Sequence, residues 1–339
     1  MNVYQTLYIT NRGERHQQAA LKAAPGNLNI TMLRSPDKVE ILKHLPGTQF
    51  LITEREGVID ADIIEAGKEL LLIQRLGTQV WDIDLDAART AGVPVCTWPI
   101  QSCIAIAEHI VMQTLGLLKQ SEASKFAMRN ARWEREPRRS DEDTFAYNWT
   151  NRKQVLSLWQ RKFGILGFGE TGLELARRLK GFEVDVSYFK RHRYPPKAES
   201  ELGIWFLKKE EIIRTCDIVC SLLPFSEQTN QSIDQLFFDA MKPGTFFIHC
   251  GSGGVVDENA LQQSIMSGKL AGAALDTYTW EPLPISNAML SLAQYPQYNL
   301  LLTPHIAAGS DQSKPDERIE EYSNIKRIMN GKKPFNQIS

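Results

Sequence analysis

The sequence predicts an α/β protein with two doubly wound parallel sheets, and three observations support this prediction. Short apolar runs typical of buried strands alternate with helix-compatible segments along almost the whole chain. They form two blocks, which a long apolar helix and a polar stretch separate. The chain has 339 residues, of which 42% are apolar and 23% charged, so its length suits two globular domains of ordinary size.

The first block contains five predicted strands and three predicted helices in alternation. Most strands are short apolar runs, and one alternates apolar with polar residues as a half-buried strand does. Pro25-Gly26 and Pro46-Gly47 break the first two helices, and Asp60 suits the N-terminus of the third. The predicted strands are 7–10, 28–33, 50–53, 70–74 and 94–96, and the helices are 17–24, 38–45 and 60–66.

Between the blocks, a helix predicted at 105–119 is apolar on most sides, so we expect it to be buried or to lie in an interface. The polar stretch 129–161 carries charges of both signs, which predicts a solvent-exposed loop. Phe145, Tyr147 and Trp149 within it indicate that it packs on something, such as a second subunit.

The second block repeats the alternation with longer intervals. Its predicted strands are 163–166, 184–189, 218–222, 245–250, 270–275 and 300–303, and its predicted helices are 173–179, 208–215, 232–241 and 259–267. This order is typical of a nucleotide-binding α/β sheet. A single tail helix is predicted over 316–330, closed by Gly331.

Composition argues against several function classes. The net charge is −1, so no basic excess points to nucleic acid or to an anionic membrane. Five cysteines, an odd number without metal-like clustering, predict buried thiols and no metal site. The N-terminus lacks a basic start followed by a long apolar run, and no apolar stretch has membrane-spanning length. We therefore expect a cytoplasmic protein with a small-molecule partner.

A glycine-rich turn gives the first functional signal. Gly167-Phe168-Gly169-Glu170-Thr171-Gly172 directly follows a predicted strand and opens a predicted helix, which is the context that a dinucleotide-binding turn requires. Gly167 permits the tight turn, Gly169 lets the backbone approach a pyrophosphate, and Gly172 lets helix and strand pack closely. The helix N-terminus offers free N–H groups to the phosphates.

The end of the next strand indicates which dinucleotide is bound. An Asp or Glu there would accept a hydrogen bond from the ribose of NAD, but this chain has the cations Lys190, Arg191 and Arg193. Cations at this place suit the 2′-phosphate of NADP, so we expect NADP, with NAD possible. The alternative is a basic surface loop.

Three further segments make the resemblance specific: Gly253-Gly254-Val255-Val256-Asp257-Glu258, Gly272 to Asp276 followed by Glu281-Pro282, and Leu302-Thr303-Pro304-His305. Together with the glycine turn, they resemble the D-isomer-specific 2-hydroxyacid dehydrogenases, such as glyoxylate/hydroxypyruvate reductases and phosphoglycerate dehydrogenases. Gln74-Arg75-Leu76-Gly77 and Ala107-Glu108-His109 are similar to that family as well.

The resemblance implies two domains. A flavodoxin-like substrate domain would comprise 1–100 and 307–339, and a Rossmann-like NAD(P)-binding domain, 101–306, would be inserted into it. The helix at 105–119 would support a homodimer. The resemblance also implies further cofactor-binding residues, namely Leu223, Pro224, Thr229, Cys250, Gly251 and Asp276, and a substrate-binding loop with Arg75, Leu76, Gly77 and Thr78.

The family's proton donor and its carboxylate partner are matched by His305 and Glu281. When hydride reaches a carbonyl carbon, the oxygen gains negative charge, and a protonated His305 would donate to it. Glu281 would hold the ring in place.

Two positions depart from the family pattern. Ser252 stands where the family has a catalytic Arg that clamps the substrate carboxylate, and a serine cannot supply a bidentate cation. Gln79 stands where a second glycine is usual in the substrate loop. Arg55, Arg75 and His109 are the candidates for a replacement cation.

Two main function hypotheses follow. The first is an NADP-dependent oxidoreductase that acts on a small carbonyl or hydroxy acid substrate, with His305 as proton donor. The second is a catalytically weak NADP(H)-binding sensor or interaction module, like the corepressor relatives within the family. A third possibility is another reaction that uses a tightly held cofactor.

Overall fold

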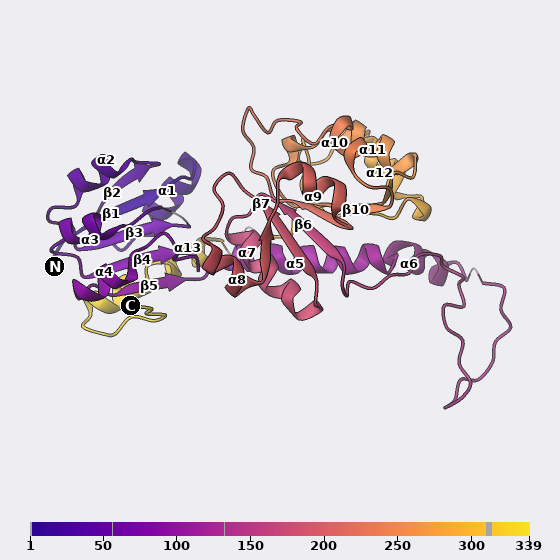
Figure 1. The fold of residues 1–339 in the computed structure, drawn as a ribbon, viewed down its shortest axis with the longest axis horizontal. Helices are drawn as coiled ribbons and strands as arrows, with labels where there is room; N and C mark the ends of the chain where they lie inside the picture. Colours follow the sequence, from indigo (N-terminus) through magenta and orange to yellow (C-terminus); the bar gives the residue numbers. More distant parts are fainter. Residues whose placement is uncertain (1, 56, 132, 310–313) are drawn as a thin grey trace. The chain divides into compact units, whose positions relative to one another are not determined.

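The computed structural model describes residues 2–55, 57–131, 133–309 and 314–339, with backbone only at 314–316. The chain forms two compact units (Figure 1). Unit 1 comprises Met1–Ile104 and Gly309–Ser339, and unit 2 comprises Ala105–Ala308. Unit 2 is therefore inserted into the sequence of unit 1, and the predicted class of two parallel α/β sheets is confirmed.

Unit 1 contains a five-stranded parallel sheet in the order β2-β1-β3-β4-β5. Its strands are β1 (Tyr4–Thr10), β2 (Leu28–Arg34), β3 (Phe50–Glu54), β4 (Leu72–Leu76) and β5 (Val95–Trp98). The predicted start of the fourth strand, at residue 70, was two residues too early. Leu70 still belongs to the turn after the preceding helix, because its N–H donates to the carbonyl of Gly67 at 3.0 Å.

Both faces of this sheet are buried, and alternate side chains of one strand serve each face. Leu7 and Ile9 join the core beneath α2 (Lys38–His44), α3 (Ala61–Ala66) and α4 (Leu85–Thr90). Tyr8, between them, joins the opposite core with α1 (Glu14–Ala23) and α14 (Ser323–Met329).

Aspartates begin three of these helices. Asp37, Asp60 and Asp84 each accept a hydrogen bond from a backbone N–H in the first turn of α2, α3 and α4. An N-cap of this kind satisfies one of the donors that a helix start leaves open. The helix start predicted at Asp60 is confirmed.

The prediction of a single tail helix over 316–330 was wrong. The tail forms α13 (Lys314–Glu320) and α14, separated at Glu321 and Tyr322. Tyr322 departs from helical backbone angles, with φ −89° and ψ 4°. Its buried hydroxyl donates to the carbonyl of Ala20 at 2.8 Å. Helical periodicity in the sequence carries no information about this tertiary contact.

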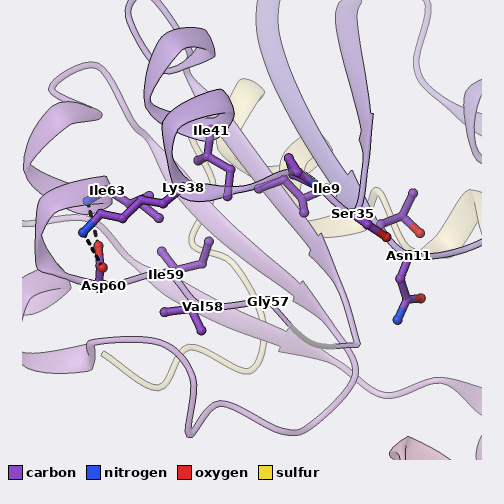
Figure 2. A pocket seen from close by; sticks show the side chains of 12 residues that line it. Ile9, Asn11, Ser35, Lys38, Ile41, Gly57, Val58, Ile59, Asp60 and Ile63 are labelled. Atoms are coloured by element: carbon purple, nitrogen blue, oxygen red, sulfur yellow. Dashed lines mark hydrogen bonds and ion pairs between the residues drawn. The ribbon is translucent and has the colours of Figure 1, made fainter.

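A pocket of about 340 Å³ lies in unit 1 among the segments that follow β1, β2 and β3. Figure 2 shows an apolar wall that includes Ile41, Ile59 and Ile63. At its edge, the ammonium of Lys38 contacts the carboxylate of Asp60 at 2.7 Å. The pocket thus occupies the carboxyl edge of the sheet, where open α/β sheets bind ligands.

Arg75, on β4, is fully buried. Its Nη2 lies 2.9 Å from Oδ1 of Asp82, whose side chain is 27% exposed. The guanidinium also donates to the carbonyls of Arg55 at 3.0 Å and Gly57 at 3.1 Å. It therefore fastens the segment after β3 to β4.

We expect Arg75→Ala to destabilise the protein by about 3 kcal/mol, because it leaves Asp82 and two carbonyls without a cation. Arg89→Ala is the matched control, since Arg89 pairs with Asp86 on the surface and should contribute less than about 0.5 kcal/mol. Urea unfolding monitored by circular dichroism measures both variants. Equal effects would contradict the anchoring role of Arg75.

Unit 2 contains a seven-stranded parallel sheet in the order β12-β11-β10-β9-β6-β7-β8. The strands are β6 (Lys162–Leu166), β7 (Asp185–Phe189), β8 (Ile204–Phe206), β9 (Ile218–Ser221), β10 (Thr245–His249), β11 (Leu270–Leu275) and β12 (Leu300–Leu302). The strand order reverses between β6 and β9, which creates a crevice at their carboxyl ends. The strand β8, which has three residues and lies at the edge of the sheet, was not predicted from the sequence.

Helices cover both faces of this sheet. On one face, α9 (Lys209–Thr215), α10 (Gln235–Ala240) and α11 (Glu258–Met266) lie side by side (Figure 1) and share a core with the strands. On the other lie α5 (Gln101–Leu118) and α7 (Glu170–Leu179), which Arg178 and Glu108 connect through an ion pair of 3.0 Å. The other α-helices of unit 2 are α6 (Ser121–Arg129), α8 (Pro196–Leu202) and α12 (Ala288–Ala293).

The polar stretch predicted as a loop contains no helix or strand at its described residues between 130 and 161. Four of its five aromatic side chains form two pairs: Trp133 with Trp149 at 4.8 Å between ring centroids, and Phe145 with Tyr147 at 4.7 Å. Within the described part of the chain, no helix combines the length and the hydrophobicity that crossing a membrane requires.

Candidate active site

The glycine-rich turn connects β6 to α7, as its spacing predicts. Gly167 has φ +89°, and a Cβ there would lie 2.8 Å from backbone atoms of Leu222. Gly169 is the N-cap of α7, and among the described residues, apart from its chain neighbours, none has an atom within 4 Å of where its Cβ would be. A Cβ at Gly172 would lie 3.0 Å from the ring of Phe168. The start of α7 therefore has the open N–H groups and the room that a pyrophosphate requires.

The basic segment after β7 uses its three cations differently. Arg193 pairs with the carboxylate of Glu199 through two contacts, of 2.8 and 2.6 Å, and this pairing holds the pKa of Glu199 below its usual range. The ammonium of Lys190 lies 4.3 Å from the ring centroid of Tyr194. Arg191 is exposed. Lys190 and Arg191 are thus better placed than Arg193 to meet a phosphate.

The loops after β9 and β10 lie against each other at the carboxyl edge of the sheet. The N–H of Ser252 donates to the carbonyl of Leu223 at 3.0 Å, and a Cβ at Gly251 would lie 2.6 Å from that oxygen. The hydroxyl of Thr229 donates to the carbonyl of Pro224 at 2.7 Å and closes the first loop. These two loops bring the predicted residues Leu223, Pro224, Thr229, Cys250, Gly251 and Ser252 together.

Ser252 is held from two sides. Nε2 of the buried His249 donates to the Ser252 carbonyl at 3.1 Å. On the other side, a Cβ at Gly253 would lie 1.8 Å from the carbonyl oxygen of Tyr278, so only glycine fits. Burial lowers the pKa of His249 to about 4, and the imidazole is therefore neutral at physiological pH.

His305 and Glu281 form the predicted pair. Nδ1 of His305 lies 2.6 Å from Oε2 of Glu281, and the N–H of Tyr278 donates to the other carboxylate oxygen at 3.0 Å. Glu281 is thereby fixed by backbone while it orients the imidazole. Because Nδ1 faces the carboxylate, Nε2 is the nitrogen left to meet a ligand, and the His305 side chain is 53% exposed.

The buried Asp276 fixes the turn that carries His305. It accepts hydrogen bonds from the Thr303 hydroxyl at 2.6 Å and from the backbone N–H groups of Ile306 at 3.0 Å and Ala307 at 2.9 Å. We expected Asp276 to bind cofactor, and sequence reasoning missed this positioning contact. A signal was available, because Asp276 directly follows β11 and Thr303 directly follows its parallel neighbour β12, so the two lie at one edge of the sheet.

His109 and Gln113, on α5, complete this network. Nε2 of His109 lies 3.0 Å from the Thr303 hydroxyl and 3.6 Å from Asp276. Burial lowers the pKa of His109 although Asp276 opposes the shift, so His109 does not supply the missing cation. Gln113 links the Cys250 thiol, at 3.4 Å, to Thr303, at 3.3 Å, a connection that sequence reasoning also missed.

The predicted substrate loop lies in unit 1. Gly77 has φ +123°, and its N–H donates to the carbonyl of Trp98 at 2.7 Å, which ties the loop to β5. Leu76 is buried at the end of β4, and Thr78 follows the turn. The guanidinium of Arg75 pairs with Asp82 and donates to backbone carbonyls. Arg55 is therefore the remaining predicted candidate for a replacement cation.

Comparison with known proteins agrees with this geometry. Residues 111–307, which are more than half of the chain, match the family model described as "D-isomer specific 2-hydroxyacid dehydrogenase, NAD binding domain". The chain belongs to the D-isomer specific 2-hydroxyacid dehydrogenase family. The resemblance predicted from the sequence motifs is thus confirmed.

Individual relatives extend the comparison. The chain is 27% identical to a D-3-phosphoglycerate dehydrogenase of Archaeoglobus fulgidus, over 85% of this chain and 50% of that protein. It is also 27% identical to a hydroxypyruvate reductase of Thermotoga maritima, over 85% of this chain and 87% of that protein. The chain thus spans about half the length of the phosphoglycerate dehydrogenase.

Among solved structures, the TT0316 protein of Thermus thermophilus matches with a TM-score of 0.55 and 25% identity, over 99% of this chain and 100% of that one. The similarity extends through both units of this chain.

Acidification is expected to weaken unit 2 through His249. An unfolded histidine has a pKa of about 6.5, whereas the folded His249 has a pKa of about 4. The unfolded state therefore binds the extra proton, and stability that is complete above about pH 6.5 is lost as the pH falls towards about 4. His249→Gln keeps an N–H donor but does not titrate.

We expect the apparent melting temperature of the wild type to fall more steeply than that of His249→Gln between about pH 7 and about pH 5. Differential scanning calorimetry measures both. His192→Gln is the control, since His192 is exposed and should follow the wild type. Parallel curves for the wild type and His249→Gln would rule out this contribution.

Proposed function

We propose that the chain is an NADP-dependent oxidoreductase that transfers hydride to the carbonyl carbon of a small, 2-keto acid-like substrate. The observation that carries the proposal is the His305–Glu281 contact of 2.6 Å, at the same carboxyl edge of the sheet as the glycine turn. The two relatives, a D-3-phosphoglycerate dehydrogenase and a hydroxypyruvate reductase, support the same reaction class.

The residues that would hold the cofactor are those of the glycine turn for the pyrophosphate and Lys190 with Arg191 for the 2′-phosphate. NADPH supplies the hydride when it is bound. The chain's own contribution is the proton: His305, oriented through Nδ1 by Glu281, donates it from Nε2 to the carbonyl oxygen. Asp276 keeps the imidazole in place through the turn that it anchors.

Substrate recognition is the unusual part of this proposal. Ser252 offers no cation, and burial keeps the adjacent His249 neutral. Burial also lowers the pKa of His109, which contacts Thr303. A substrate carboxylate therefore has no clamp at the usual position. The same observation favours a second candidate, a catalytically weak NADP(H)-binding sensor or interaction module, which would keep the cofactor site and lack turnover.

We also propose a cytoplasmic homodimer. The five free cysteines, of which four are buried, suit a reducing compartment. The exposed aromatic side chains Phe145 and Tyr147 give the long loop after α6 apolar surface for a second copy.

If His305 is the proton donor, His305→Asn should lower kcat by about 10²- to 10⁴-fold. The Kd for NADPH should change by less than about twofold, because the imidazole lies outside the glycine turn. Glu281→Gln should retain more activity than His305→Asn, since the ring remains but is less firmly oriented. Stopped-flow absorbance of NADPH measures turnover, and His192→Asn is the matched surface control. Full activity in His305→Asn would remove the assignment.

NADPH should bind at least about tenfold more tightly than NADH, because Lys190 and Arg191 can pair with the additional phosphate. The double variant Lys190→Ala/Arg191→Ala should remove most of this difference and reduce its dependence on salt. Lys197→Ala/Arg214→Ala is the control, since it removes the same charge from exposed positions of unit 2. Fluorescence titration gives the Kd values, and tighter binding of NADH to the wild type would refute the preference.

Ser252→Arg separates the two candidate functions. If the site is a retuned reductase, the new guanidinium should raise kcat/KM for glyoxylate or hydroxypyruvate by about tenfold or more. Ser252→Gln, which adds bulk without charge, should not. If neither variant turns over any carbonyl compound while NADPH still binds, the sensor or interaction module is the better description. High wild-type activity on glyoxylate would contradict the need for a replacement at Ser252.

A further inference from the structure

Tyr188 lies near the carboxyl end of β7, two residues before Lys190. Its side chain is fully buried, so its phenol hydroxyl requires hydrogen-bond partners inside the protein. Tyr188 is opposite Ile165 on β6, the strand that leads into the glycine turn. The residue therefore lies between the two segments proposed to hold the cofactor, which are the glycine turn and the basic segment 190–193.

The ring of Tyr188 belongs to a cluster of four aromatic side chains in unit 2. Its centroid lies 4.6 Å from that of Phe168, between the first two glycines of the turn, and 5.7 Å from that of Tyr194, just after the basic segment. Phe206, on β8, lies 5.6 Å from the Tyr188 ring. Phe168 and Tyr194 also contact each other, at 5.5 Å between centroids. The cluster thus connects the glycine turn directly to the basic segment.

The hydroxyl of Tyr188 holds the end of the basic segment. It accepts a hydrogen bond from the backbone N–H of Tyr194 at 2.9 Å and donates to Oε1 of Glu199, on α8, at 2.7 Å. Burial, and then the hydrogen bond to Glu199, raise the pKa of Tyr188, so the hydroxyl stays protonated and is able to donate. One buried hydroxyl therefore fixes the main chain at Tyr194 relative to α8.

Glu199 holds the same segment through Arg193. Its side chain is only 8% exposed, yet Arg193 reaches both carboxylate oxygens, through Nε at 2.8 Å and Nη2 at 2.6 Å. The hydrogen bonds from Arg193 lower the pKa of Glu199 more than burial raises it, so the carboxylate is ionised. Hydrogen bonds to an ionised acceptor are stronger than those between neutral groups. Tyr188 and Glu199 together fix residues 193 and 194.

These contacts also determine where Lys190 lies. Its ammonium is 4.3 Å from the ring centroid of Tyr194, and Tyr188 fixes that ring both by packing against it and through the hydrogen bond to the Tyr194 main chain. The chain between Lys190 and Arg193 is thus held at both ends before any ligand binds. A site that is ordered in advance does not lose affinity to the cost of ordering it.

We propose that Tyr188 is a positioning residue for the 2′-phosphate of NADP(H), because its hydroxyl fixes the basic segment in the conformation from which Lys190 and Arg191 pair with that phosphate. The inference rests on the NADP preference proposed above and adds the group that maintains it. NADH lacks the 2′-phosphate, so loss of the hydroxyl should weaken the binding of NADPH and not that of NADH.

Tyr188→Phe removes the hydroxyl and keeps the ring in the aromatic cluster. We expect the Kd for NADPH to rise by at least about tenfold, because the basic segment loses both hydrogen bonds of this hydroxyl. The Kd for NADH should change by less than about twofold. Fluorescence titration of the full-length protein with each cofactor gives the four Kd values.

Tyr322→Phe is the matched control. It also deletes a buried hydroxyl that makes a hydrogen bond, but in unit 1, so it should change neither Kd. If Tyr188 only stabilised the fold, Tyr188→Phe would raise the Kd values for NADPH and NADH by the same factor, and that result would overturn the positioning role.

The titrations distinguish two kinds of failure. If the wild type binds NADH as tightly as NADPH, the proposed NADP preference is wrong, and the positioning role is overturned with it. If the wild type prefers NADPH and Tyr188→Phe keeps the full preference, the positioning role alone is overturned.

Hydrogen exchange followed by NMR tests the same hydroxyl without any cofactor. In Tyr188→Phe the backbone N–H of Tyr194 loses this acceptor and should exchange at least about tenfold faster than in the wild type. Amides of β6, in the interior of the sheet, should keep their rates and so show that the variant is folded. An unchanged rate at Tyr194 would overturn the inference that the hydroxyl fixes this segment.

Discussion

The buried carboxylate of Asp276 is the constraint on which the candidate active site depends. A charge in the interior is stable only when hydrogen bonds or cations surround it. Asp276 obtains its donors from Thr303, Ile306 and Ala307, and so determines where the chain between them must pass. His305 lies in that segment. Its position therefore follows from the hydrogen bonds that the buried Asp276, after β11, requires from the residues after β12.

Unit 1 also buries carboxylates, but there a cation balances their charge. In unit 2, the neutral His109 and His249 add no charge to the network around Asp276. In unit 1, Arg318 pairs with the two buried acids Glu54 and Glu321.

Local signals in the sequence were sufficient for most of the fold. Most strand runs, the Asp60 helix cap and the glycine turn are encoded by neighbouring residues, and the structure has them at or within a few residues of the predicted positions. The edge strand β8 was not predicted. The tail was different, because Tyr322 leaves the helix for a contact with Ala20, about 300 positions earlier in the chain. The helical periodicity of the tail sequence contains no signal of a contact with a residue so far away in the chain.

The site shows the same division. His305 and Glu281 could be paired from their motifs. Three other features depend on side-chain directions that only the folded chain defines. They are the pairing of Arg193 with Glu199, the burial of Arg75 and the hydrogen bonds of Gln113. Charge alone made Arg55 and Arg75 equal candidates for the replacement cation. The complete burial of Arg75 separates them.

The composition of unit 1 from two distant segments has a consequence for synthesis on the ribosome. Tyr322 and Ile325 complete one of its two cores, and the N–H of Ile338 donates to the carbonyl of Val95 at 2.9 Å beside the edge strand β5. These residues are translated after all of unit 2. The seven-stranded sheet can therefore close while the five-stranded sheet still exposes the face that the tail will cover. During that interval Tyr8, Phe50 and Leu72 lack the tail residues that complete their core, although unit 2 has been synthesised in full.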